Sequence, residues 1–155
     1  MEHLPCGKHV IIDLTKLEGD NYRKLLNDPE RLDTIFRAAI VESGATCIGQ
    51  LFHKFEPEGV SGIYLLSESH LAYHTYPSPL PWISIDLFTC GLKCDPSKAA
   101  DYILEQFRLT AADTDKQKIL LLERGYKQED LEEKAITEKR PSIFEKEKIA
   151  VSEIS

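Results

Sequence analysis

The chain has 155 residues, of which 42% are apolar and 29% charged, a balance that is ordinary for one folded domain with its own core. Its formal net charge of −7 argues against a nucleic acid or an anionic membrane as partner, because both attract basic surfaces. No run approaches the roughly 18 apolar residues of a membrane-spanning helix, and the N-terminus lacks a basic-then-apolar leader, so we expect a cytoplasmic protein.

The first part of the chain reads as strand, helix, helix and strand. Residues 9–14 are typical of a short strand, and residues 20–27 of a helical turn or two. Asp28 and Pro29 supply the N-cap and first position of a longer helix. Its apolar residues follow at helical spacing, which indicates packing against a sheet: Leu32, Ile35, Phe36, Ala39 and Ile40. Residues 46–55 then read as a strand.

The middle of the chain holds two strand-like runs on either side of a proline-rich turn, Pro77–Pro81. The first run is Ile63–Tyr76, with a polar interruption at 67–70, and the second is Trp82–Cys90. If Tyr76 pairs with Ile83 across the turn, residues whose numbers sum to about 159 lie opposite each other. This register predicts that Ser69 lies opposite Cys90. A hydroxyl and a thiol beside Glu68 and His70 form a group that could do chemistry.

The last part of the chain adds a helix and a strand before its composition changes. Asp95 and Pro96 open a helix that reaches about Phe107, and residues 117–123 read as a strand. This order predicts an α+β fold, a two-layer sandwich with a largely antiparallel sheet and helices on one face. We expect residues 1–125 to form a single domain and the charged residues 126–155 to form a partly helical tail.

The cysteines Cys6, Cys47, Cys90 and Cys94 include no CxxC pair. In a cytoplasmic chain of this size, reduced thiols are expected rather than a disulfide framework. Their spacing does not suit the usual structural zinc sites. A zinc hydrolase built on His53, His70 and His74 is also disfavoured, because no HExxH-like spacing accompanies these histidines.

Several short motifs, in the same order along the chain, resemble the prokaryotic S-adenosylmethionine decarboxylases, pyruvoyl enzymes that cut their own chain. The resemblance runs from about residue 7 to about residue 125. The matching motifs are Gly7-Lys8-His9, Gly59-Val60-Ser61-Gly62, Ser67-Glu68-Ser69-His70-Leu71, His74-Thr75 and Asp86-Leu87-Phe88-Thr89-Cys90-Gly91.

The resemblance implies a cofactor made from the chain itself. A decarboxylase needs an electron sink that no ordinary side chain provides. A pyruvoyl group provides one through its ketone, which forms a Schiff base with the substrate amine, so neither pyridoxal phosphate nor a metal is required. By resemblance, the chain is cut between Glu68 and Ser69, and Ser69 becomes the pyruvoyl group. Cys90 is then the general acid that protonates the product carbanion, a role that a thiol can fill because it is mostly protonated at neutral pH.

Two further residues, Ser61 and His74, assist the self-cleavage by resemblance. Five residues of extended strand would carry His74 roughly 16 Å from Ser69 of its own chain. We therefore expect a two-fold homodimer in which Ser61 and His74 of one subunit complete the site of the other. For His70, a structural role on the sheet is expected.

The residues expected to bind the substrate are Phe55, Glu68 and Ser78. Phe55 lies where the family places an aromatic that stacks on adenine, and Glu68 is expected to line the same pocket after cleavage. The family usually places a glutamate after the proline that follows His74, to hold the ribose hydroxyls, but this chain has Ser78 there.

The altered loop leaves three functions open. The first is decarboxylation of S-adenosylmethionine in polyamine biosynthesis. The second keeps the pyruvoyl chemistry but acts on L-arginine or L-ornithine. The third is a non-catalytic subunit that binds a partner, and against it stands the presence of every residue that the family uses for processing.

Overall fold

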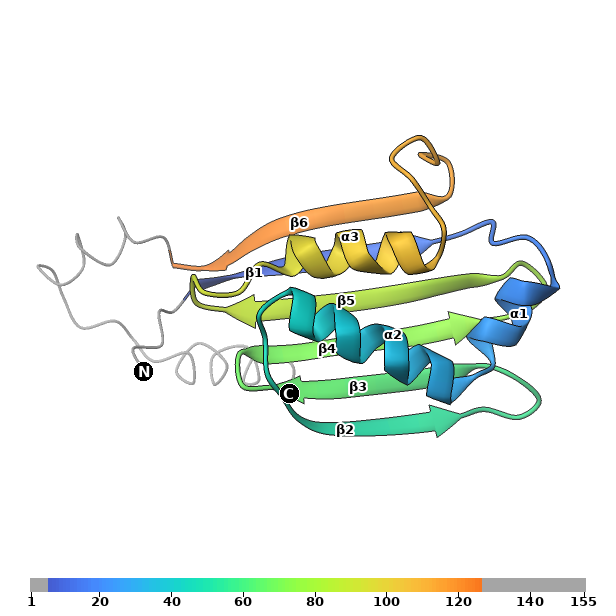
Figure 1. Ribbon diagram of the computed structural model, residues 1–155, viewed down its shortest axis with the longest axis horizontal. Helices are drawn as coiled ribbons and strands as arrows, with labels where there is room; N and C mark the ends of the chain where they lie inside the picture. Colours follow the sequence, from blue (N-terminus) through green and yellow to red (C-terminus); the bar gives the residue numbers. More distant parts are fainter. Residues whose placement is uncertain (1–5, 127–155) are drawn as a thin grey trace, which may run out of the picture. The chain divides into compact units, whose positions relative to one another are not determined.

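The structure is a computed structural model that describes residues 6–126. A sheet of six strands carries three helices on one face (Figure 1). The elements in chain order are β1 (Cys6–Leu14), α1 (Asp20–Leu26), α2 (Pro29–Glu42), β2 (Cys47–Lys54), β3 (Val60–Leu66), β4 (Ser69–Tyr76), β5 (Trp82–Cys90), α3 (Pro96–Gln106) and β6 (Gln117–Gly125). The predicted tail, apart from Tyr126, lies outside the described residues.

The sheet has the strand order β2-β3-β4-β5-β1-β6, and every neighbouring pair is antiparallel. The predicted α+β sandwich with helices on one face is therefore confirmed. The first strand of the chain, β1, lies between β5 and β6. An N-terminal strand is therefore paired on both sides with strands from the C-terminal half of the chain.

Both long helices begin at the predicted Asp-Pro pairs. The Asp28 carboxylate accepts hydrogen bonds from the backbone N–H groups of Glu30 and Arg31, and Asp95 accepts one from Ser97. The apolar faces of α2 and α3 pack on the sheet, where Phe36 stacks on Tyr73 with ring centroids 4.3 Å apart. Strand β5 alternates buried and half-buried residues along its whole length, as its period-two pattern predicts.

The predicted register of β4 and β5 is wrong by one residue. Tyr76 pairs with Trp82 rather than Ile83, because the loop consists only of the five residues from Pro77 to Pro81 and Trp82 is already the first residue of β5. Ser69 consequently lies opposite Thr89 rather than Cys90. A slip of one residue reverses the face to which a side chain points. Thr89 is therefore buried on the helical side, whereas Cys90 belongs to the opposite face.

The polar interruption at 67–70 is also not a break within one long strand. Ser67 and Glu68 form a two-residue turn that joins β3 to β4, and these two strands pair from Ser61 opposite His74 to Leu66 opposite Ser69. The turn is anchored to the start of β2 through the Ser67 N–H, which donates to the Thr46 carbonyl at 2.9 Å. The proposed cleavage site therefore lies at the tip of a hairpin.

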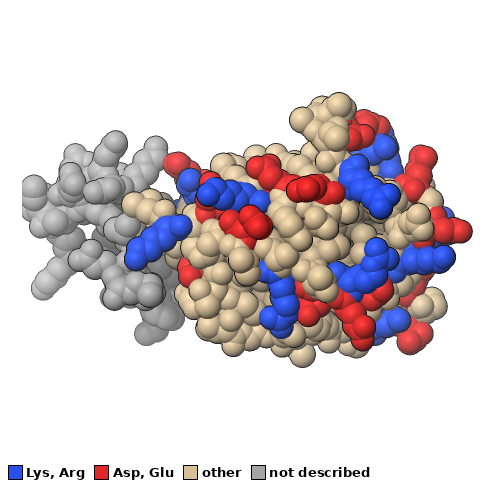
Figure 2. Space-filling view, viewed as in Figure 1, with Lys and Arg blue, Asp and Glu red and all other residues tan. Residues whose placement is uncertain are grey.

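The two faces of the sheet differ in character. Figure 2 shows the helical side, where cationic and anionic side chains are intermingled. The other face, which we call the open face, consists of the alternate strand residues that do not point toward the helices. It carries large exposed apolar side chains, including Leu51 at 71%, Leu65 at 56% and Leu120 at 53% exposure. Within residues 6–126, no helix is long and apolar enough to cross a membrane.

Candidate active site

The turn between β3 and β4 presents the Glu68–Ser69 peptide bond to the end of β5. The Cys90 backbone N–H donates a hydrogen bond of 2.7 Å to the Glu68 carbonyl oxygen. The Glu68 carboxylate accepts a second hydrogen bond, of 2.9 Å, from the Thr46 N–H. Ser69 has a φ of 156°, which residues other than glycine rarely adopt, so conformational strain is held at this peptide bond.

The Ser69 hydroxyl lies beside the next residue of the chain, His70. The distance between Ser69 Oγ and His70 Nδ1 is 3.1 Å. The pKa of the His70 imidazole is lowered from its ordinary value, first by burial and second by the nearby His9. His70 is therefore uncharged at neutral pH and can accept a hydrogen bond from a hydroxyl group.

A polar network from three strands surrounds His70. His9 of β1 lies 3.1 Å from Asp86 of β5, measured from Nε2 to Oδ1. Arg124 of β6 lies 3.3 Å from the other His9 nitrogen, Nδ1, and its guanidinium is 4.5 Å from the centre of the Phe88 ring. This network joins residues 77 and 115 positions apart in the chain.

A glycine keeps β1 close to β5 at this end of the sheet. A Cβ atom on Gly7 would lie 2.4 Å from the Thr89 carbonyl oxygen and 2.8 Å from the Phe88 ring. Any larger residue would push β1 away and displace His9 from its position beside His70. The close approach of β1 to β5 thus explains why the Gly7-Lys8-His9 motif begins with a glycine.

Ser61 and His74 form a second pair, on neighbouring strands. Ser61 Oγ and His74 Nδ1 lie 2.6 Å apart, and the two residues are directly opposite in the β3–β4 register. His74 is five residues along β4 from Ser69, which corresponds to roughly 16 Å of extended strand. A single chain therefore does not bring this pair to the Ser69 hydroxyl.

Phe55 and Ser78 belong to the same end of the sheet as His74. Phe55 follows β2, is 46% exposed, and its ring packs edge-on against His53 at 4.5 Å. Ser78 is exposed in the loop after β4 and lines an apolar groove of about 590 Å³. The stacked rings of Tyr76 and Trp82, 4.3 Å apart, line the same groove.

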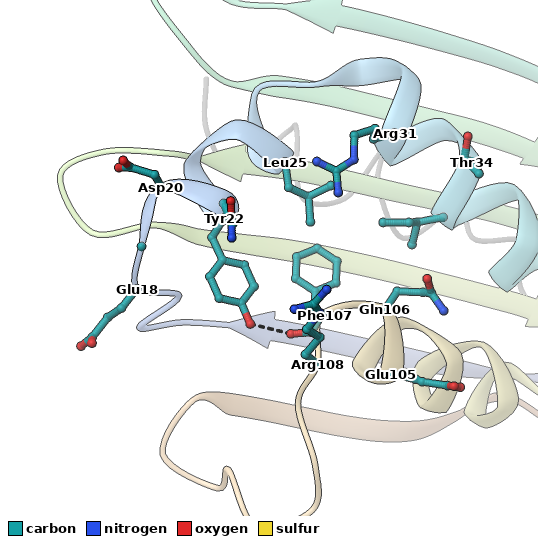
Figure 3. Close-up of a pocket in the computed structure, with 13 residues that line it drawn as sticks. Glu18, Asp20, Tyr22, Leu25, Arg31, Thr34, Glu105, Gln106, Phe107 and Arg108 are labelled. Carbon is teal, nitrogen blue, oxygen red and sulfur yellow. Dashed lines mark hydrogen bonds between the residues drawn. The ribbon is translucent and has the colours of Figure 1, made fainter.

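A separate cavity of about 880 Å³ lies on the helical side, between α1, α2 and the end of α3 (Figure 3). The Tyr22 hydroxyl donates a hydrogen bond of 2.6 Å to the Phe107 carbonyl oxygen at its edge. Its lining mixes acidic residues such as Glu18 with Arg31 and Arg108. None of the predicted site residues lines it, so we assign the chemistry to the sheet rather than to this cavity.

Sequence reasoning missed three features of the site: the Cys90 N–H that holds the Glu68 carbonyl, the contact of His70 with Ser69, and the network of His9, Asp86 and Arg124. The first depends on the register, for which the prediction is wrong by one residue. A signal for the second was present, because His70 directly follows the predicted nucleophile. Nothing in the sequence pairs Arg124 with His9.

Comparisons with known proteins point to one family. A sequence model described as S-adenosylmethionine decarboxylase matches residues 8–118. The S-adenosylmethionine decarboxylase proenzyme of Pelotomaculum thermopropionicum is 43% identical over 107 residues, which cover 69% of this chain and 79% of that protein. The proenzyme of Caldicellulosiruptor saccharolyticus is 36% identical over 121 residues, covering 78% of this chain and 94% of that one.

A solved structure agrees with these relatives. The crystal structure of the adenosylmethionine decarboxylase from Aquifex aeolicus matches with a TM-score of 0.63 and 25% sequence identity. The match covers 89% of this chain and 98% of that one.

Proposed function

The chain belongs to the S-adenosylmethionine decarboxylase family, and from this membership we propose that it decarboxylates S-adenosylmethionine with a pyruvoyl group made from its own Ser69. The observation that carries the proposal is the arrangement at the β3–β4 turn. Ser69 directly follows Glu68 in the chain, and the Glu68 carbonyl oxygen already accepts a hydrogen bond from the Cys90 N–H. Self-cleavage places negative charge on that oxygen, and a fixed N–H donor stabilises such charge as it develops.

The surroundings of Ser69 suit the group that cleavage would create. The Thr89 hydroxyl lies opposite Ser69, is fully buried, and has no hydrogen-bond partner among the described residues. A carbonyl group formed at position 69 would offer this hydroxyl an acceptor. When present, the pyruvoyl group supplies an electron sink for the carbanion left as carbon dioxide departs.

We assign proton delivery to Cys90 and substrate binding to Phe55, Glu68 and Ser78. Cys90 is half-buried at the end of β5, and its side chain belongs to the open face. Phe55 exposes enough of its ring to stack on a purine. Ser78 offers one hydroxyl to the ribose, whereas a carboxylate could accept from both ribose hydroxyls.

The distance between the two halves of the site supports a homodimer. Ser69, Glu68 and Cys90 lie at one end of the sheet, while Ser61 and His74 lie at the other. A two-fold axis through the open face would bring the second group of one subunit to the first group of its partner. The exposed leucines of the open face would be buried in the same contact.

The substrate is tested by supplying purified, mass-verified protein with carboxyl-labelled S-adenosylmethionine, L-arginine and L-ornithine in parallel. We expect labelled carbon dioxide from S-adenosylmethionine. Release from arginine or ornithine alone would reject the substrate while leaving the cleavage chemistry intact. An uncut chain that is inactive on all three would reject the proposed function as a whole.

The shared site predicts complementation between two inactive chains. Neither Ser69→Ala nor His74→Ala should be cut when expressed alone. When the two are co-expressed, the Ser69 of one chain and the His74 of the other complete one site in each mixed dimer. We expect the His74→Ala chain to be cleaved in these dimers, as measured by intact mass.

The control replaces the Ser69→Ala chain with one that carries both Ser69→Ala and His74→Ala. No intact His74 is then present, and we expect no cleavage. A protein that is monomeric in solution, or one that shows no rescue although mixed dimers are isolated, contradicts the shared site.

A further inference from the structure

His70 was expected to have only a structural role on the sheet, but its position beside the Ser69 hydroxyl indicates a role in proton transfer. Its Nδ1 lies 3.1 Å from the Ser69 hydroxyl oxygen, on the same chain and one residue away. This is the distance at which a base can take a proton in hydrogen-bond contact. The histidine of the family motif, His74, lies roughly 16 Å along the strand and cannot make this contact within its own chain.

We propose that His70 is the general base that activates Ser69 for the first step of self-cleavage. The inference rests on the proposed function, because it concerns the reaction that makes the pyruvoyl group. It assigns this first proton transfer to the cleaved chain itself and leaves the later steps of processing to Ser61 and His74 of the partner subunit.

The step is an exchange of one bond for another. His70 Nδ1 takes the proton from Ser69 Oγ, and the oxygen forms a bond to the Glu68 carbonyl carbon. The charge that develops on the carbonyl oxygen faces the Cys90 N–H, which already lies 2.7 Å away. The bond between the Glu68 carbon and the Ser69 nitrogen then breaks, and the protonated His70 returns its proton to that nitrogen. The product is an ester with a free amine, and no other reactant is needed.

The environment of His70 keeps it in the form that a base requires. Neutral histidine with its proton on Nε2 leaves Nδ1 free to accept one. The charged and titratable groups that face the ring are His9 from β1, Asp86 from β5 and Arg124 from β6, while β3 places the uncharged Leu65 opposite. Asp86 favours protonation of His70, but it is engaged by His9 at 3.1 Å, and burial, His9 and Arg124 all act the other way.

The same network explains why the base is held in place. The His70 ring packs edge-on against Phe88, with ring centroids 6.1 Å apart, and lies 6.3 Å from the ring of His9. The Arg124 guanidinium packs over the Phe88 ring, against which the His70 ring lies. These contacts fix the imidazole beside the hydroxyl before the reaction begins, so little reorganisation is needed.

Two substitutions separate a base from a structural residue. His70→Ala removes the ring, whereas His70→Asn keeps a hydrogen-bond acceptor near the Nδ1 position but cannot take up a proton at neutral pH. We expect both variants to be cut at least about 100-fold more slowly than the wild type, the lower range for general acid–base catalysis. Cleavage is followed by intact mass after synthesis of the full chain in a cell-free system.

Added imidazole gives a second readout. It should restore cleavage to His70→Ala, whose cavity can admit the free base, but not to Ser69→Ala, which lacks the nucleophile.

The dependence of the cleavage rate on pH gives a third readout. Wild-type cleavage should be constant near neutral pH and fall on acidification, with an inflection below about 6.5, where His70 becomes protonated. The slow residual cleavage of His70→Asn should lack this inflection.

The failure of this inference differs from the failure of the proposed function. If the wild type is cut and His70→Asn is cut at the same rate, His70 only positions Ser69, and the proposed base is rejected. The absence of imidazole rescue in folded His70→Ala would reject it as well. A wild-type chain that is never cut would instead reject the proposed function.

Discussion

Ser69→Ala should remain a single uncut chain with no measurable decarboxylation. The substitution removes the oxygen that attacks the Glu68 carbonyl, so neither the chain break nor the pyruvoyl group can form. Enzymes typically accelerate their reactions by about 10⁶-fold or more, and loss of the electron sink removes the chemical basis of this acceleration. Intact mass should show one species for the variant. The wild type should show two fragments, one ending at Glu68 and one beginning with the group derived from Ser69.

Ser67→Ala is the matched control, because Ser67 lies in the same turn and is exposed. Its contribution to the turn is the backbone N–H that donates to the Thr46 carbonyl, which alanine retains. We expect this variant to be cut and active like the wild type. Decarboxylation by an uncut Ser69→Ala chain would end the pyruvoyl mechanism for this protein.

Cys90→Ala should separate self-cleavage from decarboxylation. Alanine keeps the backbone N–H that binds the Glu68 carbonyl oxygen, so the chain should still be cut. It lacks the thiol that protonates the product carbanion, and general acids contribute about 10²–10⁴-fold to a rate. We expect kcat for S-adenosylmethionine to fall by that range, measured on protein whose complete cleavage has been verified by mass.

Cys47→Ala is the corresponding control for the loss of a thiol. Cys47 is also half-buried, and its sulfur contacts the Gly49 carbonyl of its own strand at 3.4 Å. It should turn over at the wild-type rate. Unchanged turnover in fully cut Cys90→Ala would show that Cys90 does not deliver the proton, and failure of that variant to cut would show that its thiol, and not only its N–H, takes part in processing.

The secondary structure could be predicted because its signals are local. The pairs Asp28-Pro29 and Asp95-Pro96 each combine a side chain that accepts N–H bonds with a residue that has none to donate, and both mark helix starts in the structure. The alternation in residues 82–90 likewise defines β5 to the residue. These patterns depend only on neighbours along the chain.

The register could not be predicted with the same accuracy, because it depends on how many residues the loop uses. Pro81 has no N–H to donate, and its carbonyl accepts from Leu17, so the loop ends at Pro81 and pairing begins at Trp82, one residue earlier than predicted. The network around His70 is still harder to predict from the sequence. It requires that β1 lies between β5 and β6, which no local pattern specifies.

The sheet order also determines what the proposed cut does to the molecule. The fragment before Ser69 would contain β1, β2 and β3, and the fragment from Ser69 onward would contain β4, β5 and β6. In the sheet these two sets interleave, so that three of the five strand pairings, β3 with β4, β5 with β1, and β1 with β6, join one fragment to the other. Strand β1 has no neighbour from its own fragment. Breaking one peptide bond therefore leaves two polypeptides that are hydrogen-bonded into a single sheet. Neither fragment contains all the strands of the sheet, so neither can form the complete fold alone.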